Sequence, residues 1–396
     1  MFHKYDTLLL GVTIGLTLFG LAMIASVSVF ESFQITSRLV RDGSLDEPNN
    51  AFYLWRNFWH VVTGLGLMCF LATVPYRLWE KLALPIFAFS LILLMALFIP
   101  GLGADYGTAR SWLDIGPFSM QPSEFMKLSL ILYLAVWLQK REQLVQTLEQ
   151  GFLPFAILLA STTFLVALQP DLGSVLVLTS IAVTMFFIAG GNVFHIFVGG
   201  AISALVSLPL ILSKSYIRAR FLAFLRPDDP TISETIGFQI NQALIAVGSG
   251  RLFGQGYGKS IQKFGYLPEV QSDTIFAAMG EELGFFRMMI IMGLFSIIVL
   301  QGFKIARNAP DRFGLLVAAG ITSWLGFQIV INIFVNLSLM PLTGITLPLI
   351  SYGGSSHWAT LAAIGILLNI SAYSTEEKVK KRRRTSRGVP GKMAKT

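Results

Sequence analysis

Residues 263–284 read KFGYLPEVQSDTIFAAMGEELG. This stretch is polar and turn-forming, and it lies in a chain whose other segments are mostly apolar. It carries four carboxylates, at Glu269, Asp273, Glu281 and Glu282. Because an ionised carboxylate near a membrane is costly unless the protein pairs it or uses it, these acids mark a functional region.

The composition around this stretch is that of a membrane protein. Of 396 residues, 54% are hydrophobic and 13% are charged, whereas soluble domains carry about 25% charged residues. Apolar runs of spanning length lie at residues 7–30, 57–75, 82–100, 124–139, 153–169, 174–190, 192–213, 285–303, 313–335 and 354–370. The sequence therefore predicts an all-α polytopic membrane protein with about ten transmembrane helices.

The charges in the loops predict the orientation of these helices. With the N-terminus inside, the inner segments hold seventeen lysine and arginine residues, whereas the short outer loops hold four. By the positive-inside rule, both termini are then cytoplasmic. The polar loops 101–123, 169–173, 214–284 and 336–353 fall outside. The loop 214–284, between helices seven and eight, is the large extracytoplasmic loop.

The chain divides into one transmembrane domain, 1–373, and a basic tail, 374–396, which we expect to be disordered. The tail carries most of the net charge of +8 and directly follows an apolar helix. Anionic membrane lipids are therefore the expected partner of the tail, and nucleic acid is not, since the sequence predicts no folded basic domain. Cys69 is the single cysteine, which rules out an internal disulfide and a thiolate metal cluster.

Short polar motifs lie where the expected helices begin or break. Gln121 precedes a proline that suits the first position of the fourth helix. Glu124 and Lys127 follow at a spacing that lets them neutralise each other, as a structural ion pair or as part of a site. Asp171 lies between two helices, where it is either an N-cap or an acid that faces a ligand.

A further irregular segment, residues 348–356, reads PLISYGGSS beside the last expected helix. Irregular backbone at membrane depth is tolerated when it is buried in protein or lines a wet cavity. Ser351, Tyr352 and Ser355 make this segment a candidate cavity wall, with a plain re-entrant turn as the alternative.

Asp273 is the candidate catalytic residue of the opening stretch. The apolar residues that follow it raise the pKa of a carboxylate by desolvation, whereas a nearby cation such as Lys263 lowers that pKa. A carboxylate of tuned basicity can take a proton from a sugar hydroxyl. Outer cations, among them Arg220 and Lys263, would hold a pyrophosphate leaving group, with charge balance in the loop as the alternative.

The other acids of the stretch receive different roles. Glu281 and Glu282 are expected to open the next helix, where carboxylates interact favourably with the helix dipole. Glu269 is expected to support the loop or the substrate.

An ordered set of motifs resembles the SEDS family (shape, elongation, division and sporulation), over about residues 5–372. The motifs lie at 112–116, 121–127, 169–173, 220–227, 237–239, 263–273, 280–284 and 341–356. The residues at 237–239 and 262–269 resemble the FtsW branch of that family more than the RodA branch. The sequence departs from the usual motifs at Gln271, Ser272, Thr274, Ser111 and Ser338.

The resemblance implies a peptidoglycan glycosyltransferase that polymerises lipid II at the outer face of the bacterial cytoplasmic membrane. It implies a multi-pass protein of the division septum, with a class B penicillin-binding protein and other division proteins as partners. The substrates would be lipid II and undecaprenyl-pyrophosphate-linked glycan. No metal ligand or organic cofactor follows from it, and a divalent cation, Mg²⁺ or Mn²⁺, is left open.

The resemblance also implies roles for single residues. The catalytic acid of the family falls on Asp273, which would activate the acceptor hydroxyl. Glu124 and Lys127 match a charged pair of the family, and Arg220 and Lys263 match basic positions of its large outer loop. Arg110 lies next to Ser111, where the family usually has an arginine.

Three alternatives belong to other classes or branches. The first is a transporter or flippase of lipid-linked cell-wall precursors, which broken helices and buried charges would also suit. The second is an elongation-type, RodA-like polymerase. The third is a scaffold that recruits partners, which would explain the basic tail but not the large outer loop.

Overall fold

The structure, a computed structural model, describes residues 5–100, 103–106, 109–115, 118–226 and 236–387. Its elements are α1 (Thr7–Val27), α2 (Val29–Arg41), α3 (Phe52–Thr73), α4 (Arg77–Ala96), β1 (Gly103–Tyr106), β2 (Ala109–Ile115), β3 (Phe118–Met120), α5 (Pro122–Lys140), η2 (Leu148–Phe152), α6 (Leu153–Ala167), α7 (Leu172–Ile188), α8 (Val193–Ser213), α9 (Ser215–Leu225), α11 (Ile236–Ser249), α12 (Ile275–Arg307), α13 (Arg312–Asn336) and α14 (Gly354–Arg387). Each predicted apolar run coincides with one of these helices, namely α1, α3, α4, α5, α6, α7, α8, α12, α13 and α14.

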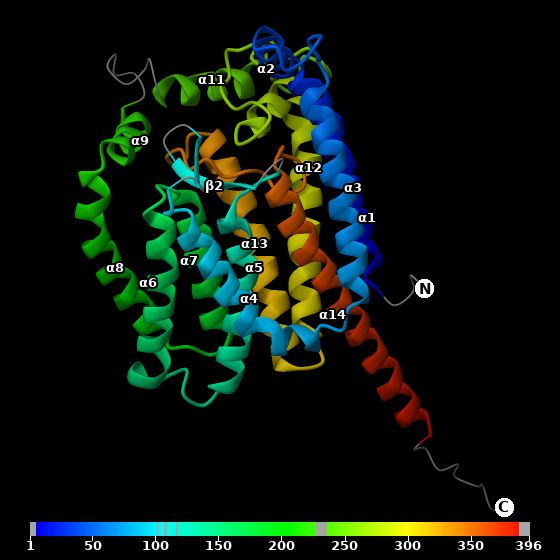
Figure 1. Cartoon of the computed structure of the whole chain (residues 1–396). Helices are drawn as coiled ribbons and strands as arrows, with labels where there is room; N and C mark the ends of the chain where they lie inside the picture. The colour runs from blue at the N-terminus through cyan, green and yellow to red at the C-terminus, as the bar shows by residue number, and fades with distance from the viewer. Residues whose placement is uncertain (1–4, 101–102, 107–108, 116–117, 227–235, 388–396) are drawn as a thin grey trace, which may run out of the picture.

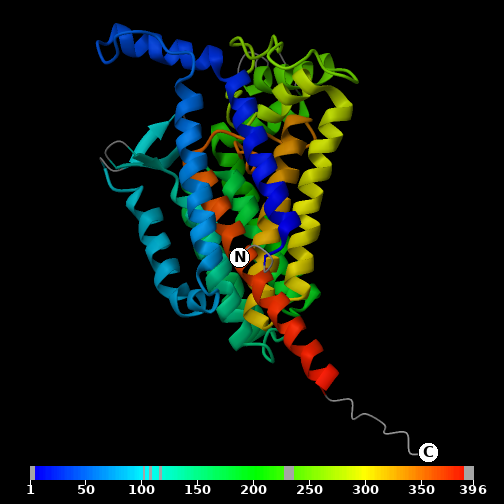
Figure 2. The same cartoon turned by 90° about the vertical axis from the view of Figure 1, so that its right-hand side faces the viewer.

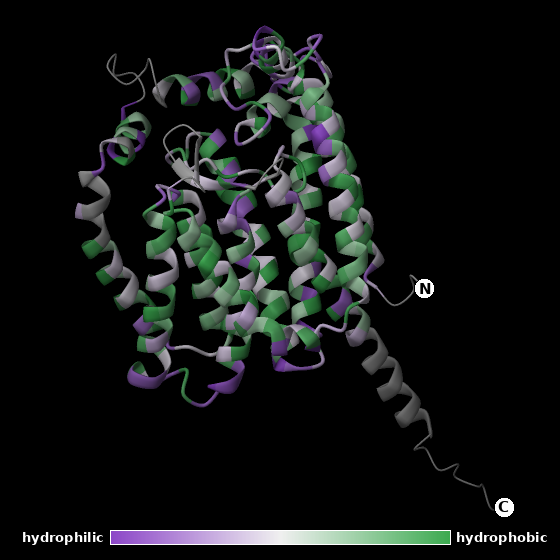
Figure 3. Cartoon of the chain, in the orientation of Figure 1, coloured by the Kyte–Doolittle hydropathy of each residue, from purple (hydrophilic) through white to green (hydrophobic). Residues whose placement is uncertain are grey.

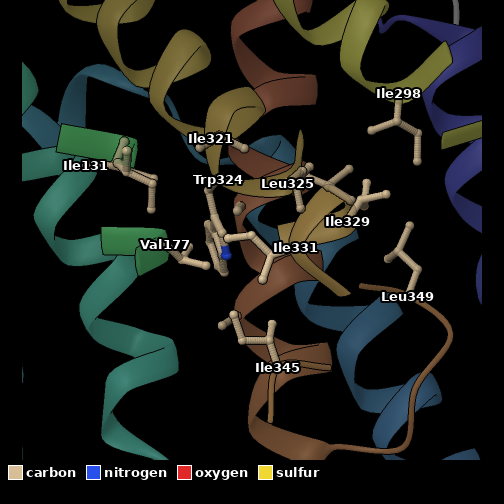
Figure 4. Packing of buried hydrophobic residues seen from close by; sticks show 14 of the residues in the cluster. Ile131, Val177, Ile298, Ile321, Trp324, Leu325, Ile329, Ile331, Ile345 and Leu349 are labelled. Atoms are coloured by element: carbon tan, nitrogen blue, oxygen red, sulfur yellow. The ribbon is translucent and has the colours of Figure 1, made fainter. Parts of the chain in front are cut away.

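Helix α13 lies at the centre of the bundle (Figure 1). It packs against α5, α7, α12 and α14. The buried share of its apolar window is 78%, against 22% to 44% for the other candidate spans. Figure 4 shows this core, with Trp324 and Leu325 of α13 near Ile131 of α5 and Val177 of α7. The helix is therefore much more buried than the other candidate spans, although Phe327, Val330 and Phe334 on one side of it are exposed.

The helical bundle has the pattern of a membrane protein. Among the described residues, five helices have the length and hydropathy to cross a membrane. They are α1, the η2–α6 helix, α4, α12 and α13, with α7 and most of α8 as shorter apolar helices. Apolar residues fill the middle of the bundle, and hydrophilic residues gather at its ends (Figure 3). The first helix, α1, runs from its start at Thr7 up to the end where α2 and α11 lie, and α14 runs down to the opposite end (Figure 1), as the predicted topology requires.

The predicted outer loop 101–123 contains a small antiparallel sheet in the order β1-β2-β3. Gly103 pairs with Leu113, and Leu113 in turn pairs with Met120. This sheet departs from the all-α expectation. Its strands are short, and their alternation of buried Ser111 and Leu113 with exposed Asp114 is too brief to stand out in the sequence.

A short amphipathic helix, α2, lies across the upper end of the bundle and does not continue the direction of α1 or α3 (Figure 2). Its buried residues are the hydroxyl-bearing Ser32 and Thr36. Ser32 accepts a hydrogen bond from the backbone amide of Tyr53, in the first turn of α3, at 3.2 Å, and Thr36 accepts one from the amide of Asn49, in the connection before α3, at 2.9 Å. These bonds fix the helix to the top of the bundle.

The large outer loop 214–284 is mostly ordered around two helices, α9 and α11, which pack together. Helix α11 covers residues 236–249 of this loop, and residues 227–235 lie outside the described residues. The last part of the loop is helical from Ile275 onward, so α12 begins about ten residues before the predicted start at 285. Gly284 interrupts α12 with φ 75° and ψ 175°.

The interruption at Gly284 is filled by another part of the same loop. The amides of Gln255 and Gly256 donate to the carbonyls of Glu281 and Glu282, at 2.9 and 3.0 Å. A Cβ atom on Gly284 would overlap the backbone nitrogen of Gly254. The break therefore satisfies its backbone groups locally and requires glycine twice over, for its φ angle and for space.

The end of the chain differs from the expectation of disorder from 374 onward. Helix α14 continues to Arg387, well past the bundle (Figure 1). Residues 388–396 of the predicted tail lie outside the described residues.

Replacing Gly284 with alanine tests the packing of the break. We expect G284A to lower the free energy of unfolding by roughly 2 kcal/mol or more, because the left-handed backbone and the overlap with Gly254 both penalise a Cβ atom. G293A is the matched control, since a Cβ atom there meets nothing within 4 Å. Thermal unfolding in detergent measures both variants, and equal midpoints would contradict the packing described.

Candidate active site

Asp273 lies in the turn that leads into α12. The Ser272 amide donates to the Glu269 carbonyl at 2.9 Å, and the Thr274 hydroxyl donates to the Pro268 carbonyl at 2.7 Å. Glu269 adopts the left-handed conformation, with φ 52°. The turn is therefore closed by its own polar groups, and Thr274, one of the departures from the family pattern, takes part in closing it.

Two side-chain amides of α13 hold the backbone of Asp273. Asn332 and Asn336 each donate from Nδ2 to the Asp273 carbonyl oxygen, both at 2.9 Å. Each asparagine is about 1% exposed. These two contacts attach the turn to a helix that is largely buried in the bundle.

The carboxyl group of Asp273 lies among groups that shift its pKa in both directions. Desolvation raises the pKa to about 7, and the negative charge of Glu269 adds to the rise. The backbone, the Arg220 guanidinium and a hydrogen bond from the Gln239 side chain act in the opposite direction. Oδ1 is buried and has no hydrogen-bond partner among the described residues. The group thus has the basicity of a general base near neutral pH and one oxygen to offer to a reactant.

Arg220 is the cation whose charge lowers the pKa of the Asp273 carboxyl group. It is half-buried on α9, and its Nη1 donates to the Leu342 carbonyl at 3.1 Å. Desolvation lowers the pKa of Arg220, and the charges of Asp273 and Asp171 raise it. Arg220, Asp171 and Asp273 therefore share one electrostatic environment, although they are far apart in the sequence.

Asp171 and Gln121 join the starts of α7 and α5. Asp171 caps α7 through a hydrogen bond from the Ser174 amide at 2.9 Å. Its other oxygen accepts from Gln121 Nε2 and Ser123 Oγ, both at 3.2 Å. The backbone amide of Gln121 in turn donates to Ser355 Oγ at 3.0 Å. Asp171 is thus the N-cap that one interpretation predicted, and it also links three polar motifs.

Glu124 and Lys127 form the predicted ion pair, and they are almost fully buried. Lys127 Nζ lies 2.7 Å from Glu124 Oε1. It also donates to Gln328 Oε1 of α13 at 3.0 Å and lies 5.6 Å from the Trp324 ring centroid. Glu124 Oε2 is buried and has no partner among the described residues. The pair is anchored to the same face of α13 that holds Asp273.

Lys263 lies in a different cluster. Its Nζ is 3.1 Å from Glu282 Oε1, and it donates to the Gly258 carbonyl at 2.7 Å and to Ser26 Oγ at 3.2 Å. The lysine is 4% exposed, and it is not among the groups that shift the pKa of Asp273. The structure does not bring Lys263 together with Asp273, and its role in substrate binding stays a prediction.

The helix-opening role expected for Glu281 and Glu282 is wrong. Both are buried in the helical turns that precede the break at Gly284. Glu282 pairs with Lys263, and Glu281 accepts from the Ser260 hydroxyl at 2.5 Å and from the Ile261 amide at 3.0 Å. The carboxylates hold the loop to α12, a role that linear spacing does not reveal.

The 348–356 segment contacts the turn of Asp273 through its backbone. The Tyr352 amide donates to the Gln271 carbonyl at 2.8 Å, and the Tyr352 ring packs edge-on against Tyr53. Ser351 is buried, and its Oγ accepts from the Leu347 amide at 2.8 Å. The segment is therefore held by its own hydrogen bonds and packs beside the turn that carries Asp273.

Two predicted site residues lie at the edge of this arrangement. Glu269 is exposed, and its negative charge raises the pKa of Asp273. Arg110 belongs to β2, and its side chain lies outside the described part of the chain.

The sequence interpretation missed the amides of α13. Gln328, Asn332 and Asn336 recur every four residues, which places them on one face of the helix. Their signal is detectable, since polar amides at helical spacing are unusual in an apolar span. Among the described residues, no group of three or more His, Cys, Asp or Glu side chains is placed to hold a metal ion.

The comparison with protein families decides the relationship of the chain. The family model for cell cycle proteins of the FtsW, RodA and SpoVE type matches residues 6–376. The chain belongs to this family. The resemblance inferred from the ordered motifs is thereby confirmed.

Named relatives of the family cover nearly the whole chain. Stage V sporulation protein E of Bacillus subtilis is 41% identical over 373 residues, which are 93% of this chain and 97% of that protein. A protein of Geobacter sulfurreducens named probable peptidoglycan glycosyltransferase FtsW is 38% identical over 370 residues, 93% of this chain and 95% of that protein.

Solved structures confirm the fold class. A chain of a peptidoglycan synthase complex, described as coordinating polymerization and crosslinking, matches with a TM-score of 0.75 at 29% identity. The match covers 93% of this chain and 98% of that chain. The rod shape determining protein RodA of Thermus thermophilus matches with a TM-score of 0.64 at 28% identity, over 93% and 97% of the two chains. The chain is an integral membrane protein of this fold.

Removing Lys127 tests whether the buried pair is structural. We expect K127M to lower the free energy of unfolding by about 3–5 kcal/mol, because it leaves the Glu124 carboxylate buried without its cation. The double variant E124Q/K127M should recover most of that loss. K140M, at the exposed end of the same helix, is the control. If K127M unfolds like K140M and loses only activity, the pair acts on substrate instead.

The raised pKa of Asp273 predicts a pH dependence of stability. The folded protein binds this proton up to about pH 7, whereas the unfolded chain releases it near the ordinary value of 3.8. The Asp273 carboxyl therefore favours folding most at low pH, and this contribution is lost as the pH rises through about 7. Unfolding midpoints at about pH 5 and about pH 8 should differ more for the wild type than for D273N. Parallel changes in both proteins would contradict the assignment.

Proposed function

We propose that the chain is a peptidoglycan glycosyltransferase that polymerises lipid II at the outer face of the cytoplasmic membrane. One observation carries the proposal, the environment of the Asp273 carboxyl group. Its pKa is raised to about 7, and the positive charge of Arg220 acts on it. Its Oδ1 atom is buried and has no hydrogen-bond partner among the described residues. The naming of relatives at 38% identity as peptidoglycan glycosyltransferases supports it.

The chemistry follows from these groups. Asp273 takes the proton from the acceptor sugar hydroxyl as that oxygen forms a bond to the anomeric carbon of the donor. The bond from the anomeric carbon to the lipid pyrophosphate breaks, and the pyrophosphate leaves with the electron pair. Arg220, half-buried near Asp273, stabilises the negative charge that develops on the leaving group. A divalent cation remains open as a further source of that stabilisation.

The placement of the polar groups favours an enzyme over a transporter. Asp273, Arg220, Asp171 and Gln121 all belong to segments that the predicted topology places at one end of the bundle. A transporter of lipid-linked precursors needs polar sites near the midplane with access from both faces. The buried Glu124–Lys127 pair lies deeper but is closed by Gln328 and Trp324.

The cellular role that we propose is cell-wall synthesis at the division septum. The relatives named FtsW support it. Synthesis of a sporulation cell wall is a second candidate, favoured by the 41% identity to stage V sporulation protein E. An elongation role, as the name of RodA describes, has only the likeness at 28% identity behind it.

The partners that we propose follow from the same comparisons. The match to a synthase complex of polymerization and crosslinking supports a class B penicillin-binding protein as a partner, together with other division proteins. Helix α14, which runs past the bundle into the basic region, supports contact between the tail and anionic lipids of the inner face.

Polymerisation of labelled lipid II by the purified chain, with and without its penicillin-binding partner, tests the proposal. We expect D273N to fold and insert normally but to lose glycan synthesis by a factor of about 100 or more, since the base is gone. D42N removes an exposed acid beside α2 and is the control. Normal polymer from D273N would overturn the mechanism.

A further inference from the structure

The polar face of α13 connects segments that are distant in the sequence. Gln328, Asn332 and Asn336 follow one another at four-residue spacing toward the C-terminal end of α13, where the turn of Asp273 is bonded to this helix. Their exposed fractions are 0%, 1% and 1%. Because a buried amide costs free energy unless it is hydrogen-bonded, the partners of these three residues are specific contacts.

Each of these amides joins α13 to an irregular segment. Gln328 accepts from Lys127 at 3.0 Å and donates to the Thr346 carbonyl at 3.1 Å. Asn332 donates to the Ile345 carbonyl at 2.7 Å and to the Asp273 carbonyl at 2.9 Å. Asn336 donates to the same Asp273 carbonyl. The turn that carries the acid is thus fixed to the helix twice, by two donors on one acceptor.

We propose that Asn332 and Asn336 are positioning residues that hold the backbone of Asp273, and with it the carboxyl group, in the place where it acts as general base. This inference rests on the function proposed above. The asparagines touch no reacting atom, and they act through the Asp273 carbonyl. Their own burial makes the attachment rigid, since both asparagines lie on a face of α13 that is packed against other segments of the protein.

The geometry also accounts for the surroundings of the carboxyl. Glu269 faces it from its own turn, and Arg220 faces it from α9, with Asp171 near Arg220. Gln239 of α11 offers a neutral amide, and α13 contributes only neutral amides. Release of the turn from α13 would let the carboxyl move toward water, and a better solvated carboxyl ionises at lower pH.

The two donors on one acceptor predict non-additive effects. N336L removes one donor and leaves the carbonyl paired with Asn332, so we expect a loss of kcat of less than about tenfold. The double variant N332L/N336L frees the carbonyl, and we expect a loss of about 100-fold in kcat with KM for lipid II changed by less than about threefold. T322V, which removes a buried hydroxyl of α13 bonded to its own helix, is the matched control.

The pH profile separates positioning from a general loss of stability. In the double variant, the acid limb of the rate profile should move to lower pH by about one unit, because the carboxyl is better solvated. A variant that is merely less stable loses active molecules without moving this limb. An unchanged acid limb, with activity falling in proportion to the folded fraction, would overturn the proposal.

A labelling experiment gives a readout that does not depend on catalysis. In a C69A background, S272C places a thiol next to Asp273. We expect its rate of modification by a maleimide to rise about tenfold in N332L/N336L and not in T322V, because the turn opens more often. Equal rates in both would overturn the proposal. If D273N still polymerises while labelling rises as expected, the function assigned to Asp273 fails and the attachment of its turn stands.

Discussion

An apolar bundle must pair every polar group that it buries, and α13 is where this constraint is met for the site. The segments around Asp273 and residues 341–349 are irregular, so their carbonyls have no partners from secondary structure. Asn332 supplies a donor to one carbonyl of each segment. Irregular backbone can therefore lie inside the bundle, close to the membrane, where the Asp273 carboxyl group is shielded from bulk water.

A second buried arrangement fixes the outer loop from the other side. Lys263 and Glu282 join the loop to α12, and Ser26 brings α1 into the same cluster. A buried pair of this kind is costly to break, because either charge alone would remain desolvated. The loop thus belongs to the folded core, and Asp273 lies between two anchors, one of amides on α13 and one of charges on α12.

The sequence predicts the helices well and the site only in part. Long apolar runs specify the spans, since length and hydropathy are local properties, and the Glu124–Lys127 pair follows from helical spacing. Lys263 shows the limit: the sequence does not indicate its pairing with Glu282, which depends on tertiary packing. The start of α12 at Ile275 was missed because the glycine at position 284 resembles a helix boundary, and the structure does break the helix there but places a further helical segment before the break. Contacts such as that of Asn336 with Asp273 depend on tertiary packing and have no linear signature.

The spacing of the amides on α13 has a consequence for how this family can vary. Successive amides are four residues apart, or roughly 6 Å along the helix axis, and each points in nearly the same direction. The separation between the Lys127 pair and the Asp273 turn is therefore fixed by the number of residues between Gln328 and Asn336. The insertion or deletion of a single residue between Gln328 and Asn336 would rotate one contact by about 100° away from its partner.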